Sequence, residues 1–368
     1  MGTVKRTFAN NLLTSGKIDA TDGLSGTIPA TNLADASLTN VTSFPSSLGG
    51  AVSSVASDPP SPSDGQIWFN STSKVLKQYA YSASWATGGN MNTAKYGLTG
   101  TGTQTAGLAF AGTTTPNVSP TTSEEYNGST WTNSGSISTA KTNVGSAGIQ
   151  TAALGFGGYV GGPTVNTNVT ESYDGSTWTT VNSLNTTRRS LTGCGIQTAA
   201  LGFAGQTPAF TGATEEYDGS TWATSPGSLA TARSQLVGAG TQTAALGFGG
   251  TTPPHTGATE EYDGTSWTSG GALNTARSQG AGSINGTQTA ALGFGGNTAT
   301  GVTNTTELYD GTSWGADVNL ATPIRSHGGA GTSTSALGFG GYSPAGGGDR
   351  SATEEYTAGL GTQTITVS

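Results

Sequence analysis

The chain has 368 residues, of which 60 are glycine, with a formal net charge of −8 and only 9% charged residues. Such a composition excludes a helical bundle, and no stretch is apolar for long enough to span a membrane as a helix. The acidic balance argues against nucleic acid and anionic membranes as partners. Seven Trp, 11 Tyr and 10 Phe are too many for a solvated polar tract, so we expect a folded protein.

The first 57 residues differ from the rest. Between Ile18 and Leu48, single apolar residues stand among Gly, Ser, Thr and Asn, a pattern that cannot enclose a core on its own. We therefore expect residues 1–57 to be an extended anchoring and oligomerisation arm, which is either docked on a partner or intertwined with other copies. Three prolines indicate a stiff linker over residues 58–64, and no signal peptide is expected.

A candidate hairpin follows the linker. Residues 66–70 and 74–81 have the alternation of two paired strands, separated by a polar turn. Trp85 then lies 46 residues before Trp131. This spacing is that of the repeats described next, so the segment predicts one additional pair of strands in register with them.

Six copies of one unit make up the remainder of the chain. A segment of the type TAALGFGG recurs every 45 to 47 residues, and a segment of the type ExYDGSTW follows each copy. The Trp of the second segment is present in five copies and is missing from the last. A linker of the type LNTARS precedes each copy of the first segment. A fixed period of this length indicates a repeat architecture.

Each unit predicts four short strands. In the fourth unit, residues 234–240 and 244–248 are β-compatible and are joined by a Thr-Gln-Thr turn, and a Gly-Gly pair ends the second strand. Residues 259–262 alternate, and Asp263-Gly264 is a tight-turn pair before the returning strand. Four strands in about 46 residues match the period of a propeller blade.

These marks resemble the kelch family over roughly residues 86–368. The matching features are the Gly-Gly after the second strand, the Tyr before the Trp region, and the Arg or Lys that opens the next unit. The resemblance implies an all-β fold, a kelch-like β-propeller over residues 65–368. We expect seven blades, with six as the alternative. The end of the chain, residues 362–368, alternates as a strand does, and it either completes the sixth unit or closes a blade with residues 66–85.

Two charged positions recur in every unit. The glutamates are Glu124, Glu171, Glu215, Glu260, Glu307 and Glu354. The linker cations are Lys95, Lys141, Arg188, Arg233, Arg277 and Arg325. We expect each glutamate to pair with a cation at a blade junction, half-buried beside the Tyr and Trp; the alternative is a set of solvated surface charges. Removing one partner of a buried pair costs about 3–5 kcal/mol.

The sequence contains no pattern typical of catalysis or metal binding. Cys194 stands where sister units have Ala147 and Ala239, so we interpret it as a small buried residue. The two histidines do not repeat, and the Asp-Gly pairs lack the spacing of a calcium loop. We expect no enzyme activity, no cofactor and no metal.

The repeats also separate a constant face from a variable one. Turns within the two hairpins of each unit are nearly identical, whereas the loops between the second and third strands differ in length and sequence. Loops that vary on a constant scaffold are typical recognition sites. The candidate binding residues are Tyr159, Phe210, His255 and Tyr342, which are suited to stacking on sugars or packing on a protein. The alternative is that they only cap the blade edges.

The chain is similar to bacteriophage virion proteins in its Gly- and Thr-rich N-terminal segment and in the hairpin that begins at Asp64-Gly65. The resemblance implies that residues 1–57 bind other virion proteins and that the repeat module is displayed to the host on the virion surface after assembly in the host cytoplasm. We therefore expect a homo-oligomeric, non-enzymatic tail fibre or surface fibre that binds a host-surface glycan or protein. The alternatives are a decoration or adaptor protein without receptor binding, and a non-viral kelch-type lectin or scaffold.

Overall fold

A computed structural model describes residues 52–160 and 165–365 of the chain. Within these ranges the backbone forms strands and turns, and no helix is long and apolar enough to cross a membrane. Contacts divide the chain into two compact units, residues 1–82 with 359–368, and residues 83–358. The second unit is thus narrower than the predicted domain 65–368. Most of the predicted arm 1–57 lies outside the described residues.

The first unit contains the predicted hairpin. β1 (Val52–Val55) pairs in parallel with β2 (Ile67–Asn70), which pairs antiparallel with β3 (Val75–Thr87). Oδ1 of Asp58 accepts hydrogen bonds from Trp68 and Asn70, and Oδ2 pairs with Nζ of Lys77 at 2.6 Å. The bonds from Lys77, Asn70 and Trp68 lower the pKa of Asp58 to about 2. This carboxylate therefore ties the segment before the hairpin to both of its strands.

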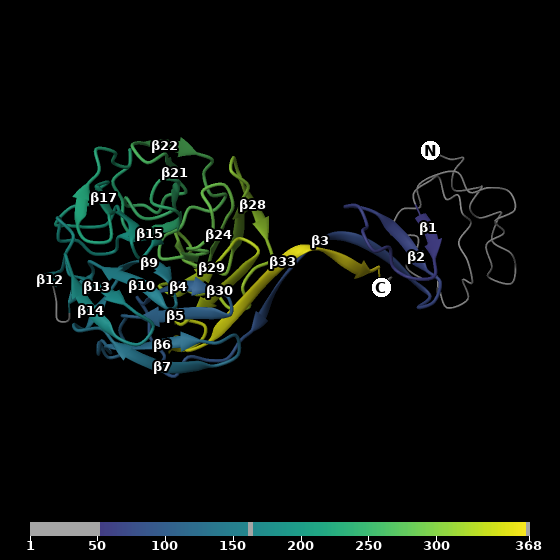
Figure 1. Cartoon of the computed structure of the whole chain (residues 1–368), viewed down its shortest axis with the longest axis horizontal. Coiled ribbons are helices and arrows are strands. Elements are labelled where there is room, and N and C mark those ends of the chain that lie inside the picture. Colours follow the sequence, from purple (N-terminus) through teal and green to yellow (C-terminus); the bar gives the residue numbers. More distant parts are fainter. Residues whose placement is uncertain (1–51, 161–164, 366–368) are drawn as a thin grey trace, which may run out of the picture. The chain divides into compact units, whose positions relative to one another are not determined.

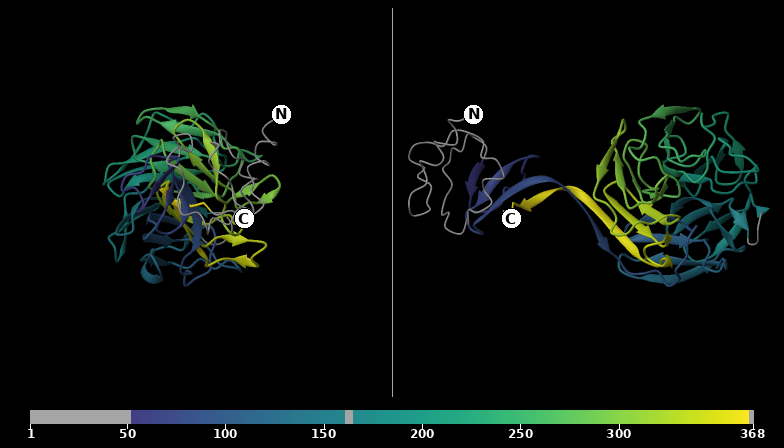
Figure 2. Two further views of the ribbon diagram at one scale, coloured as in Figure 1. Left: turned by 90° about the vertical axis from the view of Figure 1, so that its right-hand side faces the viewer. Right: turned by 180° about the vertical axis from the view of Figure 1, so that it is seen from behind.

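The second unit is built from six sheets that repeat one plan (Figures 1 and 2). Five of them have four antiparallel strands. They are β4 (Thr99–Thr103), β5 (Ala106–Phe110), β6 (Thr122–Tyr126) and β7 (Trp131–Ser136); β9 (Gly145–Ile149), β10 (Ala152–Phe156), β13 (Thr170–Tyr173) and β14 (Trp178–Val181); β15 (Thr192–Ile196), β16 (Ala199–Phe203), β17 (Thr214–Tyr217) and β18 (Trp222–Thr224); β19 (Val237–Gly240), β20 (Ala245–Phe248), β21 (Thr259–Tyr262) and β22 (Trp267–Gly270); β23 (Ala281–Gly282), β24 (Ala291–Phe294), β27 (Thr306–Tyr309) and β28 (Trp314–Asp317).

The sixth sheet joins strands from distant parts of the sequence. β29 (Gly328–Gly331) and β30 (Ser335–Phe339) are followed in it by β33 (Thr353–Thr364) and then by β3. The loops and linkers also contain short strands of two residues each. They are β8 (Lys141–Thr142), β11 (Tyr159–Val160), β12 (Val165–Asn166), β25 (Asn297–Thr298), β26 (Gly301–Val302), β31 (Tyr342–Ser343) and β32 (Gly348–Asp349).

The first strands of the six sheets close a ring. β4 contacts β9, β9 contacts β15, β15 contacts β19, β19 contacts β23, β23 contacts β29, and β29 returns to β4. Figure 1 shows the sheets grouped around this common centre. The second unit is therefore a propeller-like arrangement of repeated β-sheets.

The expected seventh repeat is not found among the described residues. Trp85 of β3 packs in the sixth sheet, whose unit lacks a Trp of its own, whereas β2 pairs with β1 and β3 in the first unit. The upstream hairpin and its Trp thus belong to different units, and the second unit has six sheets rather than seven. Near the chain end, Gln363 donates to the carbonyls of Ala80 and Tyr81. This strand thus pairs with the 66–85 segment, as expected in one of its two roles, but it does so in the first unit and does not close a blade.

Aromatic residues join each sheet to the next. The Phe that ends each second strand packs against the Trp of the following sheet, at 4.6 Å between the ring centroids of Phe110 and Trp178. The Gly of the next second strand makes room for this ring, since a Cβ on Gly155 would stand 2.5 Å from Phe110. The same contact recurs at Phe156–Trp222, Phe203–Trp267, Phe248–Trp314, Phe294–Trp85 and Phe339–Trp131.

The repeated Thr-Gln-Thr turn also has a structural role. Nε2 of Gln242 donates to the carbonyl oxygens of Tyr217 and Ala200 in the preceding sheet, at 2.7 and 3.1 Å. Gln104, Gln150, Gln197 and Gln288 make equivalent pairs of bonds. These amides satisfy carbonyl groups at five of the six junctions.

Cys194 lies where the repeat alignment places it. It stands opposite Leu201, as Ala147 stands opposite Leu154 and Ala239 opposite Leu246. The side chain is fully buried, and burial raises the pKa of its thiol. A buried thiol with a raised pKa is a poor nucleophile.

Candidate functional site

Five of the six repeated charge pairs are buried ion pairs at the start of their sheets. Lys141 and Glu171 are 2.8 Å apart, and neither side chain is exposed. The other four are Lys95–Glu124, Arg188–Glu215, Arg233–Glu260 and Arg277–Glu307. Burial lowers the pKa of each cation, and the partner glutamate opposes that shift. The pairs are fully buried, which is deeper than the half-buried setting expected from the sequence.

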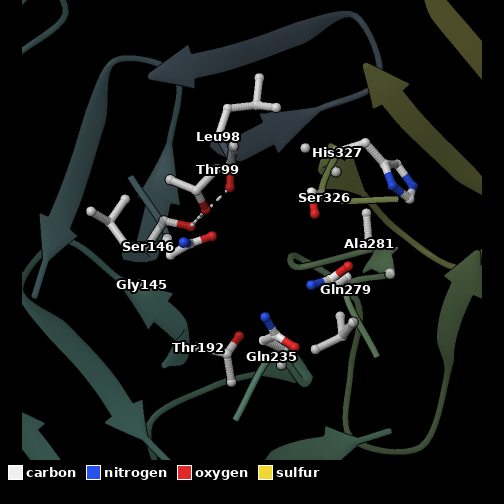
Figure 3. A pocket seen from close by; sticks show the side chains of 18 of the residues that line it. Leu98, Thr99, Gly145, Ser146, Thr192, Gln235, Gln279, Ala281, Ser326 and His327 are labelled. Atoms are coloured by element: carbon white, nitrogen blue, oxygen red, sulfur yellow. Dashed lines mark hydrogen bonds between the residues drawn. The ribbon is translucent and has the colours of Figure 1, made fainter. Parts of the chain in front are cut away.

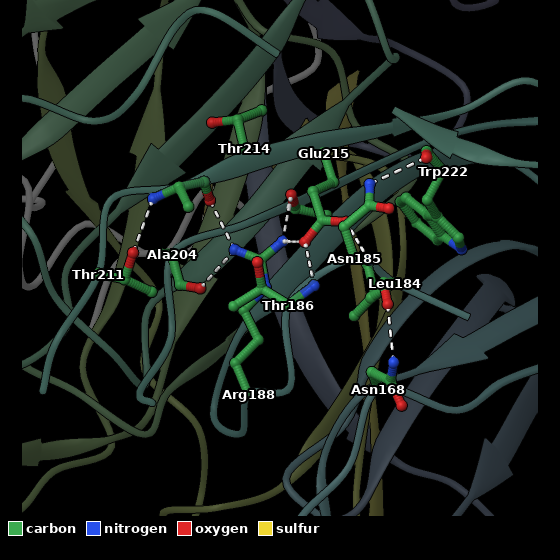
Figure 4. A network of polar contacts seen from close by, with 12 residues as sticks. Asn168, Leu184, Asn185, Thr186, Arg188, Ala204, Thr211, Thr214, Glu215 and Trp222 are labelled. Carbon is green, nitrogen blue, oxygen red and sulfur yellow. Dashed lines mark hydrogen bonds and ion pairs between the residues drawn. The ribbon is translucent and has the colours of Figure 1, made fainter. Parts of the chain in front are cut away.

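The third junction shows how such a pair is satisfied (Figure 4). The Arg188 guanidinium donates to Glu215 and to the backbone carbonyls of Ala204, Ala213 and Gly202. The other oxygen of Glu215 accepts from the backbone N–H of Asn185 at 2.6 Å. Since so many partners are backbone groups of one unit, this ion pair fixes the linker on its own sheet and is not accessible to a ligand.

Arg325 forms no ion pair with Glu354, the glutamate of the sixth unit. Ser326, with φ of 53°, is the counterpart of Gln279, with φ of 56°. Arg277 stands two residues before Gln279, and Ile324 stands two residues before Ser326, so Ile324 occupies the position of the arginine. One additional residue in this linker therefore moves the cation one position along the chain. Glu354 instead accepts a hydrogen bond from the backbone N–H of Ala321, and burial raises its pKa.

In every unit, the residue two positions after Lys95 or its counterpart belongs to a closed ring around the axis. Each of the six has positive φ, and each backbone N–H donates to the carbonyl of its counterpart in the preceding sheet, at 2.7 to 2.9 Å. The ring consists of Gly97, Asn143, Ser190, Gln235, Gln279 and Ser326. It positions their side chains around the centre, where Gln235 and Gln279 point into the opening (Figure 3).

Below this ring, a channel of about 120 Å³ follows the axis between the first strands. Thr99, Ser146 and Thr192 line it with hydroxyl groups (Figure 3). At the far end, Asn285 donates to the carbonyl of Gly148 and accepts from the N–H of Gly102, residues of two other sheets. The β23–β24 turn has two residues more than its counterparts, and these residues reach across the axis. Asn285 therefore bridges two other sheets across the axis at this end of the channel.

Above the ring, on the variable-loop face, lies a hollow of about 800 Å³, which we call the axial hollow. Three tyrosines stand at its wall, Tyr96, Tyr159 and Tyr342, with Arg325 among them. Gln235, Gln279, Asn143, Asn117, Ser119 and Ser326 supply polar groups. None of the described residues that line it is acidic.

Two of the four predicted binding residues line this hollow. Tyr159 and Tyr342 do so from the second and the sixth sheet, whereas Phe210 and His255 do not. Nδ1 of His255 hydrogen-bonds to Ser278 Oγ at 3.0 Å, and Nε2 to Asn297 at 3.3 Å, so its ring ties one loop to the next sheet.

Two lining residues that lie in the linkers, Tyr96 and Arg325, were not predicted as binding residues; Arg325 was expected to form an ion pair with Glu354. The ring of Tyr96 meets that of Tyr342 edge-on, at 5.9 Å between centroids. Arg325 lies over the other tyrosine of the pair, 5.1 Å from the centroid of Tyr342, and donates to Oε1 of Gln279 at 2.9 Å. The signal was present in the sequence, since Tyr96 and Arg325 depart from the small polar residues at this position in Thr142, Ser234 and Ser278.

Arg189 and Tyr159 repeat this arrangement at the other wall. The guanidinium of Arg189 lies 5.1 Å from the centroid of Tyr159 and donates to Gln206. Stacked guanidinium and phenol groups restrict each other's rotation, so both walls present an oriented aromatic ring. Of the two cations, Arg325 lines the hollow and Arg189 does not.

The described residues contain no group of three or more His, Cys, Asp or Glu side chains that could hold a metal ion. The buried imidazole of His327 packs on Phe294, with its ring turned away from the channel (Figure 3). The arrangement in the axial hollow suits binding through aromatic stacking and hydrogen bonds to amides and hydroxyls. No protein-family model matches the chain, and no curated protein matches it either.

Proposed function

We propose that this chain is a non-enzymatic recognition protein, a kelch-like propeller of six blades that binds a host-surface glycan or protein through the axial hollow. In this proposal residues 1–57 attach the module, as a homo-oligomer, to other proteins of a phage tail fibre or surface fibre.

The observation that carries the proposal is the convergence of Tyr96, Tyr159 and Tyr342 on one hollow that is ringed by amide and hydroxyl groups. Aromatic rings pack against the apolar faces of sugars or side chains, and the surrounding amides and hydroxyls select orientation. Variable loops and linkers form the wall, whereas the repeated strands only support it. The site therefore varies independently of the scaffold, as recognition of changing surface ligands requires.

The virion setting is supported by the sequence. The Gly- and Thr-rich composition of residues 1–57 and the hairpin after them are similar to those of phage virion proteins. The net charge of −8 favours neither nucleic acid nor an anionic membrane as the partner.

Binding of the purified chain to candidate host cells tests the recognition role. Replacing Tyr159 or Tyr342 by Ala should weaken binding about tenfold or more, as loss of an aromatic anchor does. Phe210→Ala is the matched control, because Phe210 is an aromatic residue of the same loop face that lies outside the axial hollow. Equal loss in the Phe210 variant would contradict the assignment to the hollow. Failure to bind any host cell would favour the decoration or adaptor role.

The attachment role is tested separately. The native mass of the full chain should be a multiple of its 36.4 kDa, and removal of residues 1–57 should leave a folded monomer. An unchanged oligomer after this deletion would refute the arm as the oligomerisation element. Absence of the chain from purified particles would point to the non-viral lectin or scaffold instead.

A further inference from the structure

We infer that the axial hollow binds the acidic terminal sugar of a glycan, with its carboxylate held by Arg325; this inference rests on the recognition function proposed above and names the ligand class.

The distribution of charge is the first argument. Residues 83–358 contain eight lysines and arginines, of which five are buried in the ion pairs described above. The remaining three, Arg189, Arg325 and Arg350, all lie in linkers or loops of the variable face. The constant face instead carries the exposed Asp174, Asp218, Asp263 and Asp310 in its turns. Within residues 83–358, the positive charge that is not buried in ion pairs thus lies on one face.

The geometry of Arg325 is the second argument. A guanidinium group has five N–H donors in a planar fork that matches a carboxylate. Among the described residues, Arg325 donates one hydrogen bond to a side chain, to Gln279, and its plane is held against the Tyr342 ring. The acidic loop residue Asp349, which stands opposite Tyr342 in the β31–β32 ladder, accepts hydrogen bonds from the N–H and hydroxyl of Thr115 in a neighbouring loop. Arg325 is therefore oriented at the wall of the hollow with donors left for an anion.

The shape of the site is the third argument and distinguishes a terminal sugar from an internal one. The ring of six backbone hydrogen bonds encircles the axis beneath the hollow, and beyond the channel Asn285 bridges two other sheets across the axis. A sugar that enters from the variable face meets this ring at the base of the hollow, so a chain end fits where a continuous chain would have to turn back. Tyr96, Tyr159 and Tyr342 then offer faces for the sugar ring, as aromatic residues do for pyranoses.

The test compares two disaccharides that differ in one group, a glucuronate-terminated disaccharide and its glucose-terminated counterpart. Both are titrated into the full chain and followed by saturation-transfer NMR and calorimetry. The acidic disaccharide should bind about tenfold more tightly, and added salt should reduce that preference. Arg325→Gln should abolish the preference, and Arg350→Gln, which removes a charge from the same face outside the hollow, should retain it.

The outcomes separate the two claims. Equal binding of the two disaccharides, or equal loss in the Arg325 and Arg350 variants, would overturn the acidic-sugar inference and leave recognition of a neutral ligand intact. If neither disaccharide binds, the inference is overturned, while the proposed function is still judged by cell binding of the Tyr159 and Tyr342 variants. Loss of cell binding in those variants, without binding of either disaccharide, would leave the recognition function intact with a protein or another glycan as its ligand.

Discussion

Nε1 of Trp85 donates a hydrogen bond to Oγ1 of Thr306 at 3.3 Å, although 221 residues separate the two in sequence. Its ring lies 5.0 Å from that of Phe294 and 5.2 Å from that of Tyr356. The five other Trp residues of the repeats make the same bond to a Thr or Ser of the preceding sheet. Trp85 therefore supplies the Trp missing from the last unit, and the ring of sheets is closed by a strand from before the first repeat.

Replacing Trp85 by Ala should lower the free energy of unfolding by about 2–4 kcal/mol, because a large half-buried ring is removed from the closing strand. Trp85→Phe should lower the free energy of unfolding by less. It keeps an aromatic ring in contact with its neighbours and loses only the two hydrogen bonds of Nε1. Urea unfolding measures both, and Thr87→Ala, at an exposed position of the same strand, serves as the control. A Trp85→Ala protein as stable as the parent would mean that this strand does not close the ring.

Arg233→Ala should cost about 3–5 kcal/mol, because it leaves Glu260 buried without its cation. Arg325→Ala is the matched control. That side chain is half-buried and forms no ion pair with Glu354, so its loss should cost less than about 1 kcal/mol. Thermal and urea unfolding check the difference. Equal stability of the Arg233→Ala chain and its parent would refute a structural role for the buried pairs.

Ile324→Arg should restore the sixth ion pair. In the parent chain, burial raises the pKa of Glu354, so the folded state holds this proton more tightly than the unfolded one. The group's contribution to stability is thus full below the ordinary glutamate pKa and is lost as pH rises through the folded-state pKa. The introduced cation should lower the pKa of Glu354, as NMR titration of its carboxyl carbon would record. An unchanged pKa would contradict the register assigned to Ile324.

His327→Leu should raise the free energy of unfolding by about 1–2 kcal/mol. Both ring nitrogens of His327 are buried without a partner, and four sister units have Leu or Val at this position. Burial and the nearby Arg277 lower the pKa of His327 to about 3 from its ordinary 6.5. The unfolded chain therefore binds the proton first, and stability falls as pH decreases from about 6.5 towards 3. The Leu variant should lose less stability over this window, which urea unfolding at several pH values would show.

The Asp-Gly turns should add a second dependence of stability on pH, at more acidic values than that of His327. Oδ1 of Asp218 accepts from the N–H groups of Thr221 and Ser220, and these bonds lower the pKa of Asp218 to about 2. Its contribution is present above the unfolded value of 3.8 and is lost as pH falls through 2. Asp218→Asn should keep the turn, since Asn127 makes the same bonds in the first unit, and should remove this dependence. If the free energy of unfolding falls equally with decreasing pH in the parent and in Asp218→Asn, the turn does not stabilise the Asp218 carboxylate.

Periodicity was sufficient to predict the strands, the recurring ion pairs and the place of Cys194, because each is a local property repeated in register. Periodicity could not predict the number of sheets, because Trp85 packs against the last unit, which is more than 200 residues away in sequence. The slip at Arg325 was visible as the additional residue between Leu320 and the cation, but regular spacing elsewhere concealed it.

The candidate site could be predicted only in part. Loop variability directed attention to the face that contains Tyr159 and Tyr342, two of the residues that line the axial hollow. It could not show that His255 turns towards Ser278, because side-chain direction depends on the neighbouring sheet. Tyr96 was missed because it lies in a linker, and Arg325 was assigned to an ion pair because the repeat pattern suggested that the linkers were uniform.

The most direct test of the central claim is a crystal structure of the full chain grown with glycans released from its host cell. The account predicts ligand density in the axial hollow, between Tyr159 and Tyr342 and beside Arg325. Density confined to the face of the Asp-Gly turns, or bound only at Phe210, would contradict it.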